Sequence, residues 1–253
     1  MNILVCCKVV PQEQDIAINA DRTLNLSNAG GKISQFDLNA IQAGVDIKAS
    51  LSEAKLIGLS VGGELANSPK IKKDLLSRGL DELFLSTQSD ILPPSDTACV
   101  LAAMANQTGY SLIICGDGSG DFYSSQVGMR LGAKLGIAAI SGVSEIVSVD
   151  ESRVVVLREL ENETQKLELA LPALLCVSTD INTPTIPGMK AILAASKKPA
   201  SELSVSLNAA GDVEILSIKA PARKQRLGVI VKGDSDEMID KFIQNIKHVV
   251  MAE

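Results

Sequence analysis

A glycine-rich stretch is the part of this sequence whose residue types point most directly to chemistry. The apolar run Ile113–Cys115 leads into a loop that contains Gly116, Gly118 and Gly120, and a helix is predicted to begin near Ser125. Ligands of open α/β sheets bind beyond the carboxyl ends of the strands, and the first turn of a helix offers free N–H groups and a partial positive charge. The stretch therefore predicts a phosphate site that needs no lysine.

Two better-known phosphate motifs do not fit this chain. A P-loop has the form Gly-x-x-x-x-Gly-Lys followed by Ser or Thr, whereas Gly31-Lys32-Ile33 lacks both the first glycine and the hydroxyl. The dinucleotide-binding motif requires a third glycine where Asp121 stands, and it follows the first strand rather than the fourth. A glycine-rich loop is also compatible with a plain tight turn, because glycine adopts positive φ angles. From the residues alone, both interpretations stay open.

Composition excludes several other kinds of site. The chain has 253 residues, of which 30 are acidic and 24 basic, with one histidine and no tryptophan. A metal site with three histidine ligands is therefore impossible, and a chain with a net charge of -6 and few aromatic residues is not expected to bind nucleic acid. His248 lies in a predicted amphipathic helix, where we expect it to face solvent rather than to act as a base. We predict no catalytic residues.

Cysteine usage and hydropathy favour a cytoplasmic protein. The chain has five cysteines, an odd number, at positions 6, 7, 99, 115 and 176. They show no metal-ligand spacing, so we expect reduced and mostly buried thiols and no metal. The apolar segment Ile3–Val10 lacks a preceding basic region, contains Lys8, ends at Pro11 and is much too short to cross a membrane. We therefore expect no membrane span.

The elements that must position the glycine-rich loop alternate along the chain. Buried strands are predicted at residues 1–10, 54–61, 82–86, 111–115 and 173–177, and helices at residues 36–49, 68–76, 95–104 and 125–135. Ser34 and Ser95 are candidate N-caps of the helices at residues 36–49 and 95–104, and Ser68-Pro69 opens the helix at residues 68–76. Strands that alternate with helices of about a dozen residues form right-handed βαβ units. The sequence thus predicts an α/β fold with a mostly parallel, twisted sheet flanked by helices.

The pattern changes in the second half of the chain. Residues 143–149, 153–160 and 165–171 alternate or carry β-branched side chains, with turn residues between them. We expect these segments to form antiparallel hairpins that extend the sheet.

The last part of the chain shows no core of its own. Residues 180–228 contain four prolines and few apolar runs, residues 228–232 are a candidate strand, and Ser235 precedes an amphipathic helix through Val250. We therefore predict an α/β nucleotide-binding domain over residues 1–180, followed at 181–253 by a loop and a C-terminal arm whose helix packs on another chain.

Several short motifs occur in an order that resembles the beta subunit of electron transfer flavoproteins. They are Cys6-Cys7-Lys8, Ile33–Asp37, Ser60-Val61-Gly62, Leu76–Gly79, Gly116–Gly128, Leu157–Leu160 and Ile181–Ala191. The resemblance covers essentially the whole chain. It is closest to the Fix-type and carnitine-pathway branch of bacterial beta subunits, on residues 11–16, 32–40 and 178–182. It implies an adenine nucleotide alpha hydrolase-like fold.

The resemblance also implies cofactors. An alpha subunit would hold most of one redox-active FAD, and this chain would hold an adenine nucleotide, usually AMP. By motif, the nucleotide site would comprise Cys6, Ser34, Gln35, Phe36, Asp37, Val61, Gly62, Gly116, Asp117, Gly118, Ser119, Gly120, Asp121, Ser124, Ser125, Gln126 and Val127. Such a heterodimer carries electrons between flavin dehydrogenases, such as acyl-CoA dehydrogenase-like proteins, and an acceptor. Its flavin does the redox chemistry, so the chain needs no general base, nucleophile or metal.

Three further roles are implied by the resemblance. Phe36 matches a residue at the isoalloxazine edge, although it is equally typical of a core residue at a helix start. Ile186, between two prolines, matches an exposed aliphatic residue that inserts into dehydrogenase partners, and the alternative is that it covers its own domain. Glu159 matches an acidic residue that holds a mobile flavin domain through an arginine of the alpha subunit; it is also compatible with a solvated charge.

Two departures from the family pattern affect the cofactors. Glu13-Gln14-Asp15 stands where many members have a tyrosine that touches the flavin. In electron-bifurcating relatives a second FAD replaces AMP, with a loop of the form Asp-Gly-Asp-Thr-Ala-Gln-Val-Gly. This chain keeps Gln126-Val127-Gly128 but has Phe122-Tyr123 before it, and this bulky pair favours AMP.

Two other functional classes use the same loop. A free-standing sensor of adenine nucleotides would be a stable monomer without an exposed apolar arm. An enzyme that acts on adenylates is the weaker alternative, because the glycine-rich loop carries no lysine or histidine to act on a phosphoanhydride.

Overall fold

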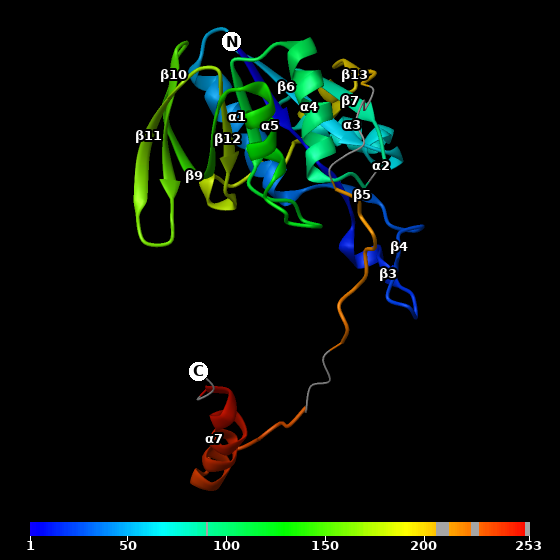
Figure 1. Ribbon diagram of the computed structural model, residues 1–253, viewed down its shortest axis with the longest axis vertical. Helices are drawn as coiled ribbons and strands as arrows, with labels where there is room; N and C mark the ends of the chain where they lie inside the picture. Colours follow the sequence, from blue (N-terminus) through cyan, green and yellow to red (C-terminus); the bar gives the residue numbers. More distant parts are fainter. Residues whose placement is uncertain (90, 206–212, 224–227, 251–253) are drawn as a thin grey trace. The chain divides into compact units, whose positions relative to one another are not determined.

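The computed structural model describes residues 1–253 except 90, 206–212, 224–227 and 251–253, and except the side chains of residues 248–250 (Figure 1). The chain divides into two compact units, Met1–Ile218 and Lys219–Glu253, which are described separately. The predicted orientation of the His248 side chain lies outside the described residues.

A nine-stranded sheet forms the centre of the first unit. Its strands lie side by side in the order β11-β10-β9-β12-β8-β1-β6-β7-β13. Six neighbouring strands are parallel: β12 (Ala173–Val177), β8 (Leu112–Gly116), β1 (Asn2–Cys6), β6 (Lys55–Gly62), β7 (Glu82–Thr87) and β13 (Ala200–Glu202). The other three pair antiparallel with one another: β9 (Ala138–Val149), β10 (Arg153–Glu159) and β11 (Thr164–Ala170). The predicted mostly parallel sheet with a hairpin extension is confirmed.

The hairpin extension joins the parallel part through β12. This strand comes late in the sequence but lies between β8 and β9, and it runs parallel to both. The start of β9 therefore belongs to the parallel sheet, whereas the rest of β9 pairs with β10.

Helices cover both faces of this sheet. One face carries α1 (Gln35–Ser50), α3 (Pro69–Ser77) and α6 (Met189–Ala195), and the other carries α4 (Pro94–Thr108) and α5 (Val127–Leu135). In β1, Ile3 and Val5 belong to the first core, and Leu4 and Cys6 belong to the second. Because both faces are buried, the central strands are apolar at most positions, which produces the apolar runs seen in the sequence; the buried Ser60 of β6 is an exception.

Short elements complete the first unit. They are the 3-10 helices η1 (Glu13–Asp15) and η2 (Thr179–Ile181), the helix α2 (Glu64–Asn67), the strand pair β2 (Val9–Pro11) with β5 (Gly31–Ile33), and the pair β3 (Ala17–Ile18) with β4 (Leu24–Asn25).

The predicted helix starts have different outcomes. Helix α3 starts at Pro69, and the Ser68 hydroxyl accepts a hydrogen bond from the Ile71 N–H at 3.3 Å, as expected for an N-cap. Helix α4 starts at Pro94 with Pro93 as N-cap, so the predicted cap at Ser95 is wrong. A proline in the first turn has the φ angle of a helix and lacks only an N–H that would have no helical partner there.

The sheet extends further along the sequence than the predicted domain boundary at residue 180. Strand β13 pairs with β7, and its flanks add hydrogen bonds from Leu83 N–H to the Pro199 carbonyl at 3.1 Å and from Leu203 N–H to the Leu85 carbonyl at 2.7 Å. The first compact unit therefore continues to Ile218. All three residues of β13 are exposed, so backbone pairing rather than an apolar pattern holds the strand.

The second unit contains one amphipathic helix, α7 (Asp236–Val250). Its first turn follows Ser235, whose carbonyl accepts hydrogen bonds from the N–H groups of Met238 and Ile239. The apolar side chains of Ile239, Phe242 and Ile243 are exposed. Residues 228–232 have no regular secondary structure, so the strand predicted there is wrong. Among the described helices, none has both the length and the apolar character needed to cross a bilayer.

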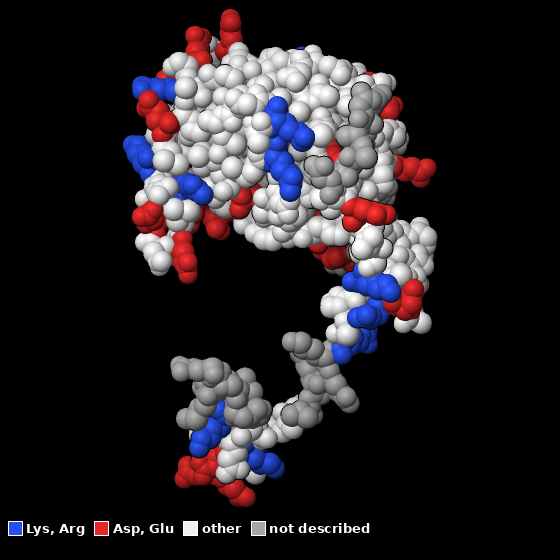
Figure 2. Space-filling view, viewed as in Figure 1, with Lys and Arg blue, Asp and Glu red and all other residues white. Residues whose placement is uncertain are grey.

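Charged side chains are unevenly distributed over the first unit. Figure 2 shows many of them over the β9–β11 hairpins, whereas the surface over α4 and α5 in the same view is largely uncharged apart from a basic patch.

Candidate functional site

A cavity of about 420 Å³ lies at the carboxyl ends of β1, β6 and β8. This is the edge of a parallel sheet at which ligands of α/β proteins bind, and the volume lies within the range of small-molecule sites. The glycine-rich loop between β8 and α5 forms a large part of its wall.

The cavity has two chemically different sides. Many of its apolar residues come from β6, α4 and the segment 213–218, among them Leu59, Val61, Leu101, Ile215 and Ile218, while the apolar Phe122 and Val127 lie in the glycine-rich loop and at the start of α5. Its polar residues come from the end of β1, from the glycine-rich loop and from α1: they include Lys8, Asp37, Asp117, Ser119, Ser124, Ser125 and Gln126. One side is therefore suited to a flat apolar ring, and the other to a polar or charged group.

Asp37 ties the glycine-rich loop to the end of the first strand. It is buried at the start of α1, and its carboxylate accepts hydrogen bonds from the backbone N–H of Lys8 at 2.7 Å and of Gly116 at 3.3 Å. Burial raises the pKa of Asp37 to about 7, although the two N–H groups and the charge of Lys8 act in the opposite direction. Burial therefore disfavours the ionised form of Asp37, and the two N–H donors only partly compensate for the lost hydration of its carboxylate.

Gly116 permits this close approach. A Cβ atom at this position would lie 2.6 Å from the Cβ of Phe36, 2.7 Å from a carboxylate oxygen of Asp37 and 2.9 Å from the backbone carbon of Phe36. The glycine is therefore required by the packing of the loop against α1. On its other side the loop is tied to β12, because Asp117 N–H donates to the Val177 carbonyl at 2.9 Å.

Lys8 and Asp121 form an ion pair that joins β1 to the glycine-rich loop. The ammonium lies 2.6 Å from the nearer carboxylate oxygen and 5.2 Å from the centroid of the Phe122 ring. Burial raises the pKa of Asp121, but hydrogen bonds from Lys8 and Ser119 outweigh this, and the net pKa is lowered. Asp121 is therefore a stable anion, and Lys8 is held beside the cavity.

The loop contains two strained backbone positions. Tyr123 and Ser125 have φ angles of 48° and 52°, in the left-handed region that residues other than glycine rarely adopt. The Tyr123 ring lies against Gly118, where a Cβ atom would come within 2.3 Å of it, and its centroid is 5.2 Å from that of Phe36. Strain of this kind is common at binding sites, where the surrounding contacts maintain it.

Three thiols form a row on the floor of the cavity. Cys6, Cys115 and Cys176 occupy neighbouring positions on the adjacent strands β1, β8 and β12, and all three are buried. Hydrogen bonds with Cys176 and Cys6, together with burial, raise the pKa of Cys115 well above its usual value. The Cys115 thiol is therefore un-ionised. All five cysteines of the chain are free, as predicted.

The structure brings most of the predicted cofactor-binding residues to the cavity. Those that line it are Cys6, Asp37, Val61, Gly116, Asp117, Gly118, Ser119, Ser124, Ser125, Gln126 and Val127. Three others, Ser34, Phe36 and Gly120, take part in contacts that hold the glycine-rich loop. The Ser34 hydroxyl accepts a hydrogen bond from Gly120 N–H at 3.4 Å, and the Phe36 ring contacts the Tyr123 ring. Asp121 acts through its ion pair with Lys8.

Gln35 and Gly62 are the two predicted cofactor residues without such a role. The Gln35 amide donates to Asn39 at 3.5 Å within α1, and the Gly62 carbonyl accepts from Gln88 N–H at 3.0 Å.

Several lining residues were not predicted. Leu101 belongs to a helix whose apolar face is typical of any core helix, so its sequence gives no separate signal. Ile215 and Ile218 are isolated apolar residues in a stretch without a periodic pattern, and only the tertiary structure places them at the cavity. Lys8 lies within the quoted motif Cys6-Cys7-Lys8 and could have been found from it.

The predicted partner-binding residues lie outside the cavity lining. Ile186 is 88% exposed, and Met189 and Leu193 of the adjacent helix α6 are also exposed. The chain just before Ile186 is held on α1, because the buried Asn39 amide donates to the Thr179 and Asn182 carbonyls at 3.0 and 2.8 Å. Glu159 is exposed at the end of β10.

No group of three or more His, Cys, Asp or Glu side chains in the described part of the chain is arranged to hold a metal ion.

Comparison with protein families gives one match. The model of the electron transfer flavoprotein domain matches residues 22–208, which is more than half of the chain. The matched part includes α1, β6, the glycine-rich loop and Ile186, and it ends before Ile215.

Proposed function

Because this chain belongs to the electron transfer flavoprotein family, we propose that it is the beta subunit of a heterodimeric electron transfer flavoprotein and that its cavity holds AMP. The observation that carries the proposal is the cavity at the carboxyl ends of the parallel strands, with the glycine-rich loop on its polar side and aliphatic side chains on the other. The family acts in electron transfer, and the subunit assignment and the nucleotide are the proposed parts.

The cavity residues fit a nucleoside monophosphate. Leu59, Val61 and Leu101 offer an apolar surface for the adenine ring, and the first turn of α5, which directly follows the glycine-rich loop, offers N–H groups for the phosphate. Lys8 adds a positive charge on the same polar side. A bound nucleotide would therefore stabilise the loop and the strand ends around it.

The redox-active FAD would be held mainly by the alpha subunit, and it supplies the electron-transfer chemistry. The residues of this chain that fit a contact with a planar ring are Phe36 and Tyr123, which lie together beside the cavity. Tyr123 is 58% exposed, so its ring is available to a neighbouring group. The role of this chain is then to position the flavin edge and to present docking surfaces.

Exposed apolar side chains support the proposed partners. The exposed residues Ile239, Phe242 and Ile243 on α7 form an apolar surface of the kind that packs against another protein, and we assign it to the alpha subunit. Ile186, Met189 and Leu193 form a second exposed apolar group, which we assign to flavin dehydrogenases. Glu159 is proposed to pair with an arginine of the alpha subunit. A free-standing sensor would not need these surfaces.

Co-expression with an alpha subunit of the same family tests the assignment. We expect a yellow complex of the two chains that releases AMP on denaturation, identified by mass spectrometry. A colourless single chain that releases no nucleotide would contradict the proposal. Release of a second FAD in place of AMP would indicate the electron-bifurcating form.

A matched pair of variants tests the assignment of α7. Phe242→Asp places a charge on the exposed apolar side chains, and we expect it to abolish copurification of the alpha subunit. Gln244→Asp introduces the same charge at an exposed polar position of the same helix, and the complex should survive. Equal recovery of the complex with both variants would exclude this surface as the interface.

A further inference from the structure

We propose that Asn39 is a positioning residue for partner docking, because its buried amide holds on α1 the segment that presents Ile186. The inference rests on the proposed function, since it concerns the exposed group of Ile186, Met189 and Leu193 that we assign to flavin dehydrogenases. It adds to that assignment the reason why the group can meet a partner without first becoming ordered. Residues 182–198, which carry the group, are called the docking segment below.

Asn39 and Asn182 form a reciprocal pair at the start of the docking segment. Asn39 lies in the second turn of α1 and is 1% exposed. Its side-chain amide donates to the Asn182 carbonyl at 2.8 Å, to the Asn182 side-chain oxygen at 3.1 Å and to the Thr179 carbonyl at 3.0 Å. In return, the Asn182 side-chain amide donates to the Asn39 carbonyl at 3.0 Å. A buried polar network with its partners in place specifies one arrangement, because another arrangement would leave polar groups buried without hydrogen bonds.

A second contact lies one turn further along α1. Gln42 follows Asn39 by three residues, so the two side chains are neighbours on the helix surface. The Gln42 side-chain oxygen accepts a hydrogen bond from Thr185 N–H at 3.0 Å, directly before Ile186. Ile186 itself precedes Pro187, and a residue before proline is restricted to extended backbone. The backbone of Ile186 is thus constrained on both sides, although its side chain is 88% exposed.

The other end of the docking segment is held on a different helix. The Lys198 ammonium donates to the Leu76 carbonyl at 3.0 Å and to the Leu80 carbonyl at 2.5 Å. Leu76 lies in the last turn of α3, where carbonyl groups lack helical partners and a positive charge is favourable. Between the two ends, α6 packs on α3 with Ala195 buried. The docking segment is therefore fixed at both ends, and its apolar group stays exposed between them.

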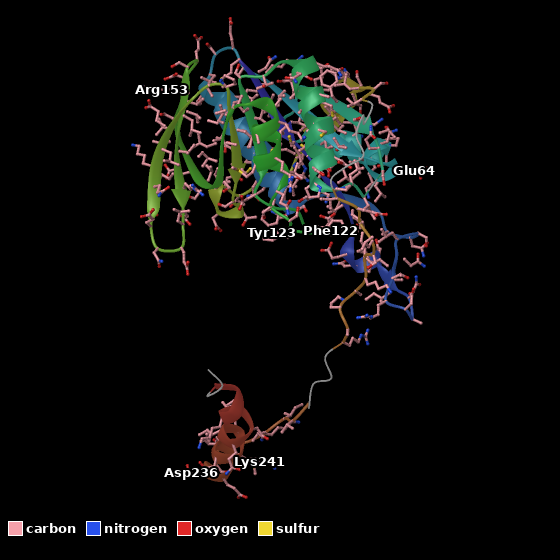
Figure 3. All side chains as sticks on the ribbon, in the orientation of Figure 1. Glu64, Phe122, Tyr123, Arg153, Asp236 and Lys241 are labelled. Atoms are coloured by element: carbon pink, nitrogen blue, oxygen red, sulfur yellow. The ribbon has the colours of Figure 1, made fainter. Side chains whose placement is uncertain are left out.

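The helix that carries Asn39 is itself anchored to the glycine-rich loop. At the start of α1, the Phe36 ring contacts the Tyr123 ring, with 5.2 Å between the centroids. Figure 3 shows Tyr123 and Phe122 next to each other at the edge of the first unit. Helix α1 therefore supports the glycine-rich loop at its start and the docking segment one turn later. This gives Asn39 a fixed base.

A constrained backbone matters for docking because of conformational entropy. An exposed apolar group that is already ordered loses little entropy when a partner covers it, whereas a mobile loop must be ordered during binding, at a cost to affinity. Loss of the Asn39 amide should therefore weaken docking and leave the other steps of electron transfer unchanged.

The test uses the FAD-loaded heterodimer as the electron acceptor of an acyl-CoA dehydrogenase from the same source, with a dye that reoxidises the heterodimer. Varying the heterodimer concentration gives KM and kcat separately. In Asn39→Ala we expect KM to rise at least about threefold, the effect of ordering one or two more side chains on binding, with kcat unchanged. Reduction by dithionite, which needs no docking, should proceed at the wild-type rate.

Gln42→Met and Asp46→Ala form a matched pair on α1 with milder changes. Gln42 accepts from Thr185 N–H and also donates to the Asp46 carboxylate at 2.8 Å. Gln42→Met removes both hydrogen bonds and should raise KM at least about twofold. Asp46→Ala removes only the second, and KM should stay at the wild-type value. If Asn39→Ala does not fold, this pair decides the question, and equal KM values in the two variants would overturn the inference.

A double variant separates positioning from a general loosening of the domain. Ile186→Ala should raise KM, because it removes the most exposed side chain of the group. If Asn39 acts through the docking segment, Asn39→Ala should raise KM by a smaller factor in the Ile186→Ala background than in the wild type. Equal factors in the two backgrounds, or an unchanged KM in folded Asn39→Ala, would contradict the inference.

The outcomes also distinguish the inference from the proposed function. If Ile186→Ala raises KM and Asn39→Ala does not, the inference fails and the docking assignment stands. If Ile186→Ala leaves KM unchanged, the docking assignment fails, and the inference fails with it. If the dehydrogenase does not reduce the wild-type heterodimer, the proposed function fails as well.

Discussion

Lys8 and Asp121 are 113 residues apart in the sequence, and the Lys8 ammonium contacts both oxygens of the Asp121 carboxylate, at 2.8 and 2.6 Å. Among the described residues that line the cavity, Lys8 is the one with a positive charge. The anion that a phosphate ligand would bring therefore competes with Asp121 for the same ammonium. The pair determines how much positive charge the cavity presents.

Lys8→Met should weaken AMP binding about tenfold, because a hydrogen bond to a charged group contributes roughly 1.5–3 kcal/mol and this side chain is partly exposed. Asp121→Asn should strengthen AMP binding a few-fold, because it removes the competing anion. Titration at low and high ionic strength measures both effects, and the salt dependence should be smaller in Lys8→Met. Unchanged affinity in Lys8→Met would show that the ammonium does not contact the ligand.

Gly116→Ala should destabilise the folded chain by roughly 1–3 kcal/mol, the usual cost of an overpacked site, and should weaken AMP binding. The added Cβ would meet the backbone of Phe36 and the Asp37 carboxylate, which cannot move independently of α1. Gly30→Ala is the control, because its Cβ would have no neighbour within 4 Å and the position does not need a positive φ angle. Denaturant unfolding of the two variants measures the difference, and equal stabilities would show that the loop can retreat from α1.

Asp37 should make the stability of the nucleotide-free chain fall as the pH rises. Its pKa is raised from 3.8 to about 7, so the folded protein binds this proton more tightly than the unfolded chain does. The stabilising contribution is complete below pH 3.8 and is lost as the pH rises through about 7.

Asp37→Asn carries no titratable group at this position, so the difference in unfolding free energy between wild type and variant should change between pH 3.8 and about 7, with a slope of at most about 1.4 kcal/mol per pH unit. Chemical denaturation across this range measures it. Parallel stability curves would mean that Asp37 keeps an ordinary pKa.

Ile215→Asp should weaken AMP binding at least about tenfold, because it places a carboxylate in the apolar wall of the cavity. Leu216→Asp is the matched control in the same segment, since Leu216 is 86% exposed and does not line the cavity. Its affinity should equal that of the wild type. Equal losses in both variants would indicate a general effect of negative charge rather than a wall at Ile215.

The central fold could be predicted because its strands are buried on both faces and are therefore apolar at most positions, as in Ile3–Cys6 of β1 and throughout β12. Strand β13 could not be predicted, since its three residues are exposed and only the backbone of β7 holds them. The cap at Ser95 failed because Pro93-Pro94 already fixes the helix start. In these places a tertiary or steric constraint outweighs the local pattern.

In the site, too, some residues could be located from local sequence patterns and others only from the tertiary structure. The glycine-rich loop could be located because glycines after a buried strand are visible in the sequence. Ser34 is the N-cap of α1, as predicted, but its hydroxyl makes no capping hydrogen bond and instead accepts from Gly120 N–H in a distant loop. Ile215 and Ile218 reach the cavity only through the tertiary path of the chain, which no local pattern encodes.

The place of β12 between β8 and β9 couples the glycine-rich loop to a part of the chain that comes after it in the sequence. Strands β9, β10 and β11 are neighbours in sequence and can pair through short loops, whereas Ala173 of β12 must find Leu112 of β8 across a long intervening chain. Non-local pairings of this kind slow folding, because the entropy of closing the intervening loop is lost before the contacts form. Because Asp117 N–H donates to the Val177 carbonyl, the glycine-rich loop has this conformation only when β12 lies beside β8.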